Sequence, residues 1–321
     1  MKSVIFMGTP EFSAPILQSL VDDKNYDVIA AVTQPDRKVG RKHILTPSPV
    51  KKVAVQNDIK VYQPEKLSGS EELQELIALN ADLIVTAAFG QFLPMSLIDS
   101  VKIAAVNVHA SLLPQYRGGA PVHYAIMNGD KETGVTIIYM VKKMDAGKML
   151  ASAKIPITAQ DDVGTMFDKL SLLGRDLLMQ TLPDLIDGKV QPLEQDETKV
   201  SFSPNISPEQ EEIDINLPAR LVDAKVRGLR PFPVAYVIME GKRTKLWKTS
   251  VIDRQTDLRP GQIVEKSKHE LLVATGSNGV ISIEELQPAG KQKMTITDYL
   301  NGVGENLHPG KQIIDNDRSK E

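Results

Sequence analysis

The chain has 321 residues, of which 41% are hydrophobic and 25% charged, with a formal net charge of −3 and no cysteine. The length suggests two domains, and the absence of cysteine excludes disulfides, thiolate catalysis and thiolate zinc sites. No stretch reaches the roughly 18 apolar residues of a membrane span, and the first residues show no cleavable signal pattern, so we expect a cytoplasmic protein that does not enter a membrane.

The first half of the chain alternates strand-like and helical patterns. Short apolar runs are separated by segments with apolar residues at helical spacing, which is typical of a mostly parallel sheet with helices on both faces. The expected strands are Val4–Met7, Val28–Val32, Asp82–Ala87 and Ile103–Val106, and the expected helices are Phe12–Val21, Pro49–Gln56 and Glu71–Leu79. The sequence therefore predicts an α/β, Rossmann-like N-terminal domain.

Gly8-Thr9-Pro10 follows the first expected strand, where a Rossmann protein carries its glycine-rich dinucleotide fingerprint. The second and third glycines of that fingerprint are absent, and Pro10 lacks the amide that a phosphate would bind. We interpret the segment as a tight turn, and we expect no nicotinamide or flavin cofactor.

Asn107 and His109 come directly after the apolar run Ile103–Val106. Residues two apart in a strand share a face, so an amide donor and an imidazole would stand together at the carboxyl end of a buried strand, where open α/β sheets bind their ligands. The pair suits chemistry that builds negative charge on a carbonyl oxygen, although it could also be structural and satisfy buried backbone groups. The loop Ser111–Pro114 would add amides and two leucines beside the pair, which could hold a flat, partly apolar ligand.

Two further segments could complete such a site. Arg117-Gly118-Gly119-Ala120-Pro121 opens an expected helix over Ala120–Met127 and would leave free amides near the strand end. Asp145 follows an expected strand over Gly134–Val141, where its carboxylate could face His109 and move a proton during attack by an amine. An ordinary turn residue is an equally good interpretation of Asp145.

The second half of the chain changes character. After an expected strand over Met149–Ile157 and a long helix over Asp162–Ile186, residues 189–207 are polar and proline-rich, as in an interdomain linker. We therefore predict a catalytic domain over residues 1–188 and a small β-barrel of the oligonucleotide-binding (OB) type over 208–315. The expected barrel strands are Ala235–Met239, Thr244–Val251, Gly261–Glu265, Glu270–Ala274 and Gly279–Leu286.

Basic residues gather in two segments of this near-neutral chain. Pro218–Lys268 carries twelve Lys and Arg against five Asp and Glu, and Arg37–Lys66 carries eight against two. Such segments are often no more than solvated surface. Together with a barrel of the OB type, they favour a polyanionic partner such as a nucleic acid.

Several motifs of the chain resemble those of the folate-dependent formyltransferases. Asn107-Val108-His109, Ser111–Pro114, Arg117–Pro121 and Asp145 resemble the active-site pattern of this family. Five segments spread over both expected domains and the linker resemble, more narrowly, the methionyl-tRNA formyltransferases: Gly8–Phe12, Thr33–Arg37, Pro47–Lys51, Gln195–Thr198 and Leu286–Lys291.

The resemblance implies transfer of a formyl group from 10-formyltetrahydrofolate to the α-amine of methionine on initiator tRNA, by direct amine attack and an oxyanion intermediate. Asn107 and protonated His109 would stabilise the oxyanion, and Asp145 would orient His109 and move the amine proton. The residues implied for folate are Ser111, Leu112, Leu113, Pro114, Phe89, Gly90, Phe92 and Leu93, and the residue implied for the tRNA acceptor end is Arg41. From the two basic segments we also expect tRNA contacts by Lys42, Lys225, Arg227, Lys245 and Lys248. No metal is implied, and we expect a monomer.

Two other functions fit parts of the sequence. A formyltransferase for a small amine, such as a purine precursor or an amino sugar, would share the Asn-His-Asp set but would not need the basic C-terminal segment. A non-catalytic RNA-binding protein would not need Asn107, His109 and Asp145 together. Lys148 departs from the family pattern, which often has an acidic residue or proline there, and it could influence the nearby Asp145.

Overall fold

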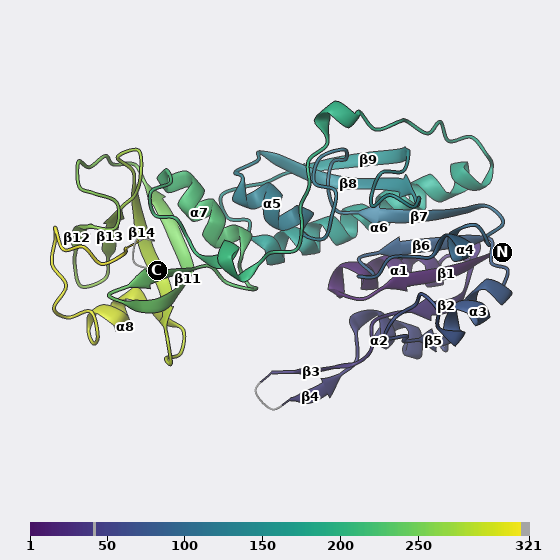
Figure 1. The fold of residues 1–321 in the computed structure, drawn as a ribbon, viewed down its shortest axis with the longest axis horizontal. Helices are drawn as coiled ribbons and strands as arrows, with labels where there is room; N and C mark the ends of the chain where they lie inside the picture. The colour runs from purple at the N-terminus through teal and green to yellow at the C-terminus, as the bar shows by residue number, and fades with distance from the viewer. Residues whose placement is uncertain (41–42, 316–321) are drawn as a thin grey trace. The chain divides into compact units, whose positions relative to one another are not determined.

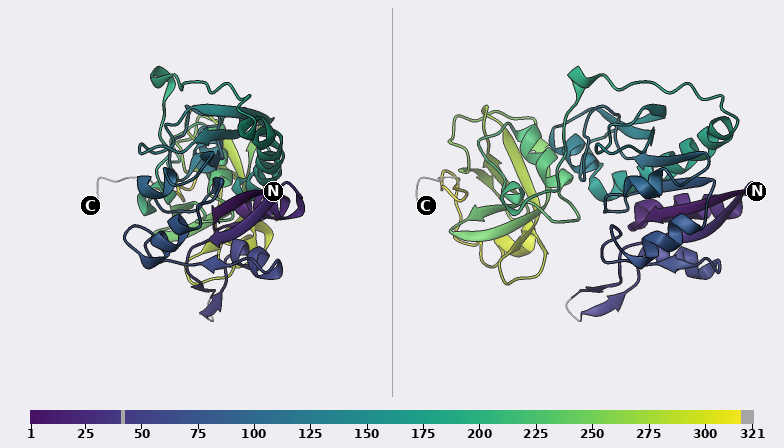
Figure 2. Two further views of the ribbon diagram at one scale, coloured as in Figure 1. Left: turned by 90° about the vertical axis from the view of Figure 1, so that its right-hand side faces the viewer. Right: turned by 45° about the vertical axis from the view of Figure 1, so that its right-hand side comes forward.

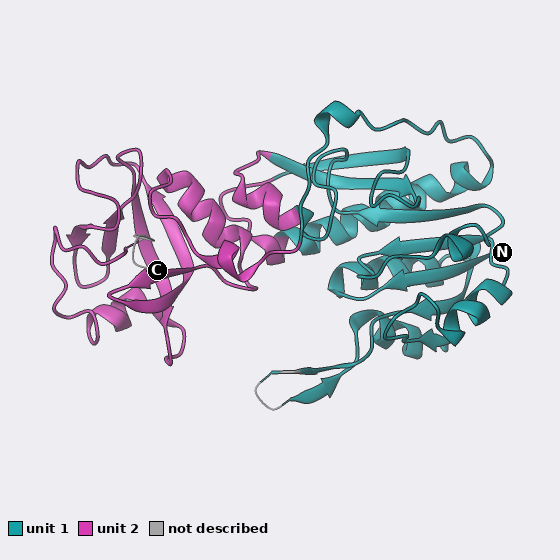
Figure 3. Cartoon of the chain, viewed as in Figure 1, with its two compact units in different colours: residues 1–121, 132–156, 166–204 teal, residues 122–131, 157–165, 205–321 magenta. Residues whose placement is uncertain are grey.

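The computed structural model of the protein describes residues 1–40 and 43–315, in two compact units (Figure 3). Unit 1 comprises Met1–Pro121, Glu132–Pro156 and Met166–Pro204, and unit 2 comprises Val122–Lys131, Ile157–Thr165 and Asn205–Glu321. Two short internal segments therefore belong with the C-terminal part of the chain. Among the described residues, no helix is both long and apolar enough to cross a membrane.

Unit 1 is built on a seven-stranded sheet with the order β5-β2-β1-β6-β7-β8-β9 (Figure 1). Neighbouring strands are parallel from β5 to β7, whereas β8 and β9 are each antiparallel to the strand before. The strands are β1 (Lys2–Gly8), β2 (Tyr26–Val32), β5 (Val61–Tyr62), β6 (Leu83–Ala87), β7 (Ala104–His109), β8 (Glu132–Tyr139) and β9 (Met149–Pro156). The predicted Rossmann-like, mostly parallel sheet is confirmed.

Helices pack on both faces of this sheet. Ile5 and Ala105 belong to a buried cluster with Leu73 of α3 (Glu71–Ala78) and Leu97 of α4 (Met95–Ile98). On the other face, the long helix α6 (Val163–Ile186) lies so close to β7 that a Cβ on Gly174 would be 2.9 Å from Val108. Because successive residues of a strand face opposite sides, Asn107 and His109 point away from α6.

Short local signals set where the remaining helices of unit 1 begin. The Ser48 hydroxyl accepts from the amide of Lys51 at the start of α2 (Pro49–Gln56), and the Ser70 hydroxyl does the same at the start of α3. Helix α1 (Ala14–Asp22) has a proline in its first turn, where no intrahelical amide is needed.

The hairpin β3 (Arg37–Val39) and β4 (Ile44–Thr46) projects from the body of unit 1 in Figures 1 and 2. The sequence patterns did not predict these strands. Ile44 and Leu45 are 60% and 61% exposed, so no buried face gives the hairpin the alternation by which strands are recognised.

Unit 2 is built on an antiparallel sheet with the order β10-β11-β14-β13-β12, and β15 pairs with β14. The strands are β10 (Tyr236–Met239), β11 (Lys242–Ile252), β12 (Ile263–Lys266), β13 (Leu271–Ala274), β14 (Val280–Pro288) and β15 (Met294–Thr295). Gln312 bridges to Gln262 beside β12 and Ile314 bridges to Met239 of β10, so the C-terminal segment joins both edges of the sheet. The predicted small C-terminal β domain is confirmed, and its sheet is antiparallel.

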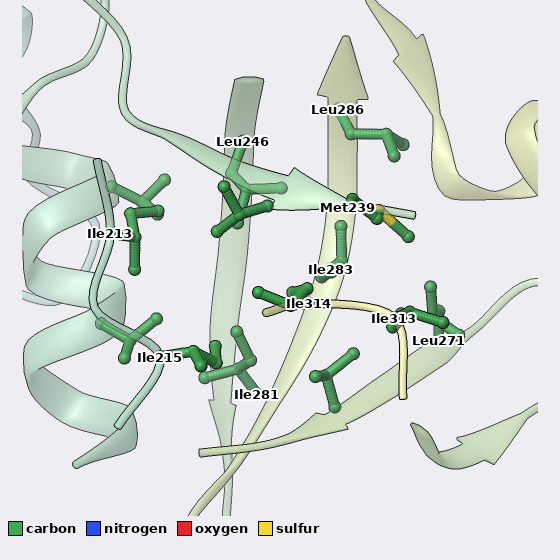
Figure 4. Packing of buried hydrophobic residues seen from close by; sticks show 14 of the residues in the cluster. Ile213, Ile215, Met239, Leu246, Leu271, Ile281, Ile283, Leu286, Ile313 and Ile314 are labelled. Carbon is green, nitrogen blue, oxygen red and sulfur yellow. The ribbon is translucent and has the colours of Figure 1, made fainter. Parts of the chain in front are cut away.

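The inner face of this sheet packs on an apolar core that includes Ile213, Ile215 and Ile314 from outside the strands (Figure 4). Helix α7 (Ala219–Gly228) contributes Val222 and Val226 to the same cluster, and α8 (Ile296–Leu300) lies at its side. Helix α5 (Pro121–Met127) packs closely on the end of α7, since a Cβ on Gly228 would overlap Met127.

Candidate active site

Asn107 lies at the carboxyl end of β7, beside Thr86 of β6. The Thr86 hydroxyl donates to the amide oxygen of Asn107 at 2.8 Å. With its oxygen engaged, the Asn107 amide directs its NH2 group toward Asp145, whose Oδ1 lies 3.5 Å from Nδ2. One of the two Nδ2 protons is left to donate to a ligand.

His109 is buried, with 6% of its surface exposed. Its Nε2 lies 3.0 Å from the carbonyl oxygen of Tyr116, which can only accept, so Nε2 carries a proton. Its Nδ1 lies 3.7 Å from Oδ1 of Asp145, which is longer than a hydrogen bond. Nδ1 is therefore the ring nitrogen that can act on a substrate.

The two carboxylate oxygens of Asp145 have different surroundings. Oδ2 accepts a 2.8 Å hydrogen bond from the backbone amide of Gly118, in the loop after β7. Oδ1 faces Asn107 and His109 together. One oxygen thus anchors the side chain, and the other meets an amide and an imidazole at one point. The structure brings the three side chains together, and their catalytic roles stay a prediction.

The loops around this point hold unusual backbone conformations. Ala88, Tyr116 and Asp145 have φ angles of 47°, 61° and 51°, in the left-handed region that non-glycine residues rarely adopt. Such strain, about 1–3 kcal/mol per residue, collects at functional sites where surrounding contacts maintain it. In the Asp145 loop, a Cβ on Gly147 would overlap the carbonyl oxygen of Tyr139, so the loop needs glycine there.

A hydrogen-bonded group behind the Asp145 loop connects it to the segment after α6. Arg117 is 1% exposed, and its Nε and Nη2 donate to Oε1 of Gln195 at 3.0 and 2.8 Å. Nε2 of Gln195 donates to the carbonyl oxygens of Asp145 and Gly147 at 2.8 and 2.7 Å. Arg117 Nη2 also donates to Glu197 at 2.7 Å. Sequence reasoning singled out the segment of Gln195 but assigned it no role.

The same segment also reaches the partner of His109. The Ser203 hydroxyl donates to the Tyr116 carbonyl at 3.1 Å, and the Ser203 amide donates to the Arg117 carbonyl at 2.8 Å. Hydrogen bonds from Arg117 and then Lys143 hold the pKa of the Glu197 carboxyl below its usual value. Although residues 189–207 have the composition of a linker, those up to Pro204 belong to unit 1 and line the back of the site.

The predicted folate residues differ in how accessible they are. Ser111, Leu113 and Phe89 are buried, and the Ser111 hydroxyl donates to the Gln115 carbonyl at 2.7 Å. Gly90 has a φ of 87°, a conformation suited to glycine. Phe92 is 69% exposed, and Leu93, Leu112 and Pro114 are half-buried.

Of the basic residues predicted to bind tRNA, four lie in the described part of unit 2 and two lie outside the described residues. Lys225 is half-buried, Lys245 donates to the Pro233 carbonyl at 3.1 Å, and Lys248 forms a 2.7 Å ion pair with Glu284. Arg41 and Lys42 lie outside the described residues.

Arg227 is held inside unit 2. Its Nε donates to Asp223 at 2.8 Å and its Nη1 to the Asp161 carbonyl at 2.9 Å. Its guanidinium therefore serves as an internal brace.

Among the described residues, the Lys148 ammonium pairs with Glu194 and forms no ion pair with Asp145. Its ammonium forms a 2.8 Å ion pair with Glu194, which raises the Lys148 pKa. Its charge is partly neutralised there.

Comparison with known proteins identifies the arrangement. The family model described as formyl transferase matches residues 1–182, and that described as the C-terminal domain of formyl transferase matches residues 205–304. The chain belongs to the formyl transferase family. This confirms the resemblance seen in the sequence.

Full-length relatives show to which members of the formyl transferase family this chain is similar. A methionyl-tRNA formyltransferase of Pediococcus pentosaceus is 88% identical over 320 residues, which cover 100% of each chain. Another of Levilactobacillus brevis is 65% identical over 315 residues, 98% of this chain and 100% of that protein. Within the family, the chain therefore groups with the methionyl-tRNA formyltransferases.

Solved structures share the fold at low identity. An N-formyltransferase of Helicobacter canadensis, in complex with folinic acid and dTDP-3-aminofucose, has a TM-score of 0.69 at 16% identity and covers 90% of this chain and 100% of its own. HypX of Aquifex aeolicus, in complex with tetrahydrofolic acid, has a TM-score of 0.61 at 15% identity and covers 98% of this chain and 50% of its own. These two solved structures share the fold of this chain.

Proposed function

We propose that this protein transfers the formyl group of 10-formyltetrahydrofolate to the α-amine of methionine carried by initiator tRNA. The observation that carries the proposal is the convergence of Asn107 Nδ2 and His109 Nδ1 on Oδ1 of Asp145, at 3.5 and 3.7 Å, in a chain 88% identical over its full length to a methionyl-tRNA formyltransferase.

Formyl transfer needs hydrogen-bond donors for the formyl oxygen, a base for the amine proton and a surface that holds the formyl donor. The formyl oxygen gains negative charge when the amine attacks, so it needs donors that are already oriented. Asn107 provides one through its remaining Nδ2 proton, fixed by Thr86. His109 provides a second through Nδ1 when the ring is protonated there, because Nε2 stays bonded to the Tyr116 carbonyl.

Asp145 would take up the proton that the amine releases. Its Oδ1 has no strong hydrogen bond from the described residues, whereas Oδ2 is tied to the Gly118 amide. A carboxylate placed in this way acts as general base, directly or through one water, and can return the proton to the departing nitrogen of the donor. No covalent bond to the protein is needed, because the substrate amine is itself the nucleophile.

The residues around the site fit a flat, partly apolar donor. Phe92 is exposed and Leu112 and Pro114 are half-buried, which leaves apolar surface for a ring system beside the polar group. When bound, 10-formyltetrahydrofolate supplies the activated formyl group. Ser111, Leu113 and Phe89 would shape this surface from beneath, since they are buried.

The acceptor tRNA would be held by unit 2 and by the β3–β4 hairpin. We propose phosphate contacts for Lys225, Lys245 and Lys248, and for Arg41 and Lys42, which lie outside the described residues. Phosphate contacts give affinity that falls steeply with salt. Arg227 would contribute indirectly, because its hydrogen bonds lie within unit 2.

The test is a formylation assay with purified protein, 10-formyltetrahydrofolate and methionine-charged initiator tRNA. We expect formyl-methionyl-tRNA, and no formylation of free methionine or of a nucleotide-linked amino sugar at the same concentrations. The absence of product at saturating substrates would overturn the proposal. Preferential formylation of a small amine would favour the alternative.

A further inference from the structure

We infer that Gln195 is a positioning residue for formyl transfer, which sets the conformation of the Asp145 loop while Arg117 holds Gln195 in place. The inference rests on the proposed function for its kinetic consequence. Gln195 lies in the polar segment 189–207, 50 residues from Asp145 along the chain.

The amide of Gln195 uses its two ends for different tasks. Its Nε2 donates to the carbonyl oxygens of Asp145 and Gly147, which lie on either side of Ala146. These two hydrogen bonds clamp the turn in which Asp145 has a φ of 51°. A left-handed aspartate is stable only when its surroundings fix it, so the clamp determines where the carboxylate points.

The other end of the Gln195 amide is anchored in the interior. Its Oε1 accepts from both Nε and Nη2 of Arg117, which is 1% exposed. Nη1 of Arg117 is buried without a hydrogen-bond partner among the described residues. A buried guanidinium with an unsatisfied nitrogen lowers the stability of the folded protein. Stability alone therefore does not explain why Arg117 is buried here. Its five donors in a rigid fork are suited to fixing the plane of the Gln195 amide.

The amide group is what distinguishes this position from a simple ion pair. A glutamate at residue 195 would still accept from Arg117, and more strongly because of its charge. It would, however, have no proton for the carbonyl oxygens of Asp145 and Gly147 and would repel both. Gln195→Glu thus keeps the anchor and removes the clamp.

The experiment compares Gln195→Glu with Glu194→Gln, the reverse exchange at the neighbouring position. Glu194 is 75% exposed and pairs with Lys148, outside the proposed site. A displacement of about 1 Å costs roughly 10²-fold in rate, so we expect Gln195→Glu to lower kcat about 10²-fold with KM for tRNA and folate within about twofold. Glu194→Gln should match the unaltered protein in each respect.

A second readout does not depend on activity. The NMR signals of the His109 ring should differ between Gln195→Glu and the unaltered protein, because Asp145 moves relative to Nδ1, and Gln195→Met should show the same difference. A Gln195→Glu protein with normal kcat, or with His109 signals identical to those of the unaltered protein, overturns the inference. If the unaltered protein forms no product, the proposed function fails, whereas the NMR comparison still tests Gln195.

Discussion

The hydroxyl of Thr86 donates to the amide oxygen of Asn107 at 2.8 Å, and the two residues are register partners in β6 and β7. This hydrogen bond fixes which end of the Asn107 amide faces Asp145. The orientation of the Asn107 amide, the proposed oxyanion donor, is therefore set by a neighbouring strand.

We expect Thr86→Val, which keeps the shape of the side chain, to lower kcat about five- to tenfold. The change corresponds to the roughly 1 kcal/mol of one neutral hydrogen bond. Thr86→Ser should restore most of the rate because it retains the hydroxyl. Steady-state kinetics at saturating folate measure kcat for both variants. Equal kcat values for the Val and Ser variants would show that the Thr86 hydroxyl does not orient Asn107 for catalysis.

Gly147→Ala should damage the Asp145 loop directly. Its Cβ would overlap the carbonyl oxygen of Tyr139, and we expect about 1–3 kcal/mol of lost stability together with a loss of kcat. Gly302→Ala is the matched control, because the nearest atom to its Cβ is 3.6 Å away. Thermal unfolding and formylation rates measure both effects. A Gly147→Ala protein as active as Gly302→Ala would show that the loop tolerates displacement.

His123 on α5 should make the stability of the protein depend on pH. Burial lowers the pKa of His123 below its usual value, and a hydrogen bond with the Phe232 backbone opposes this in part. The unfolded chain takes up the proton near pH 6.5 and the folded protein only at lower pH. His123 thus contributes its stability fully above about pH 6.5, and this contribution is lost as the pH falls through the folded pKa.

Melting temperatures of the unaltered protein and of His123→Gln, compared at about pH 7.5 and pH 5.5, check this prediction. The unaltered protein should lose more stability on acidification than the variant does. Parallel losses would mean that His123 titrates normally in the folded protein.

Two basic residues of unit 2 should behave differently when replaced by alanine. Lys245→Ala should weaken tRNA binding at low salt and reduce the slope of log affinity against log salt by about 1. Arg227→Ala should instead destabilise the fold by roughly 3 kcal/mol, because it removes the partner of Asp223 in a largely buried ion pair. Salt-dependent binding and thermal unfolding separate the two. If the two variants changed tRNA binding and thermal stability equally, Lys245 would not be a phosphate contact distinct from the structural Arg227.

The sequence predicted the parts of the fold that a strong periodicity specifies. Helix α2 was predicted with its observed bounds, Pro49–Gln56, and α6 to within one residue at its start, because apolar spacing and caps agree there. Helix α7 was missed. Its ten residues hold four charged groups and a glycine, so tertiary packing on the sheet rather than local propensity makes it helical.

The candidate site was predicted in the same uneven way. Asn107 and His109 could be paired because strand alternation puts them on one face. The contributions of Thr86 and Gln195 could not be predicted, because Thr86 lies on a neighbouring strand and Gln195 in a segment beyond α6. Contacts between residues so distant in the chain leave no periodic signal in one sequence.

We propose that Asn107, His109 and Asp145 act on the reacting formyl group and not on substrate binding. The most direct test is the single-turnover rate of formyl transfer by Asn107→Ala, measured with both substrates saturating and with tRNA affinity determined on the same protein. Removing one oriented donor should slow the step about 10²–10³-fold and leave tRNA affinity within about twofold. A near-normal single-turnover rate, or a loss confined to tRNA affinity, would show that Asn107 does not act on the reacting formyl group.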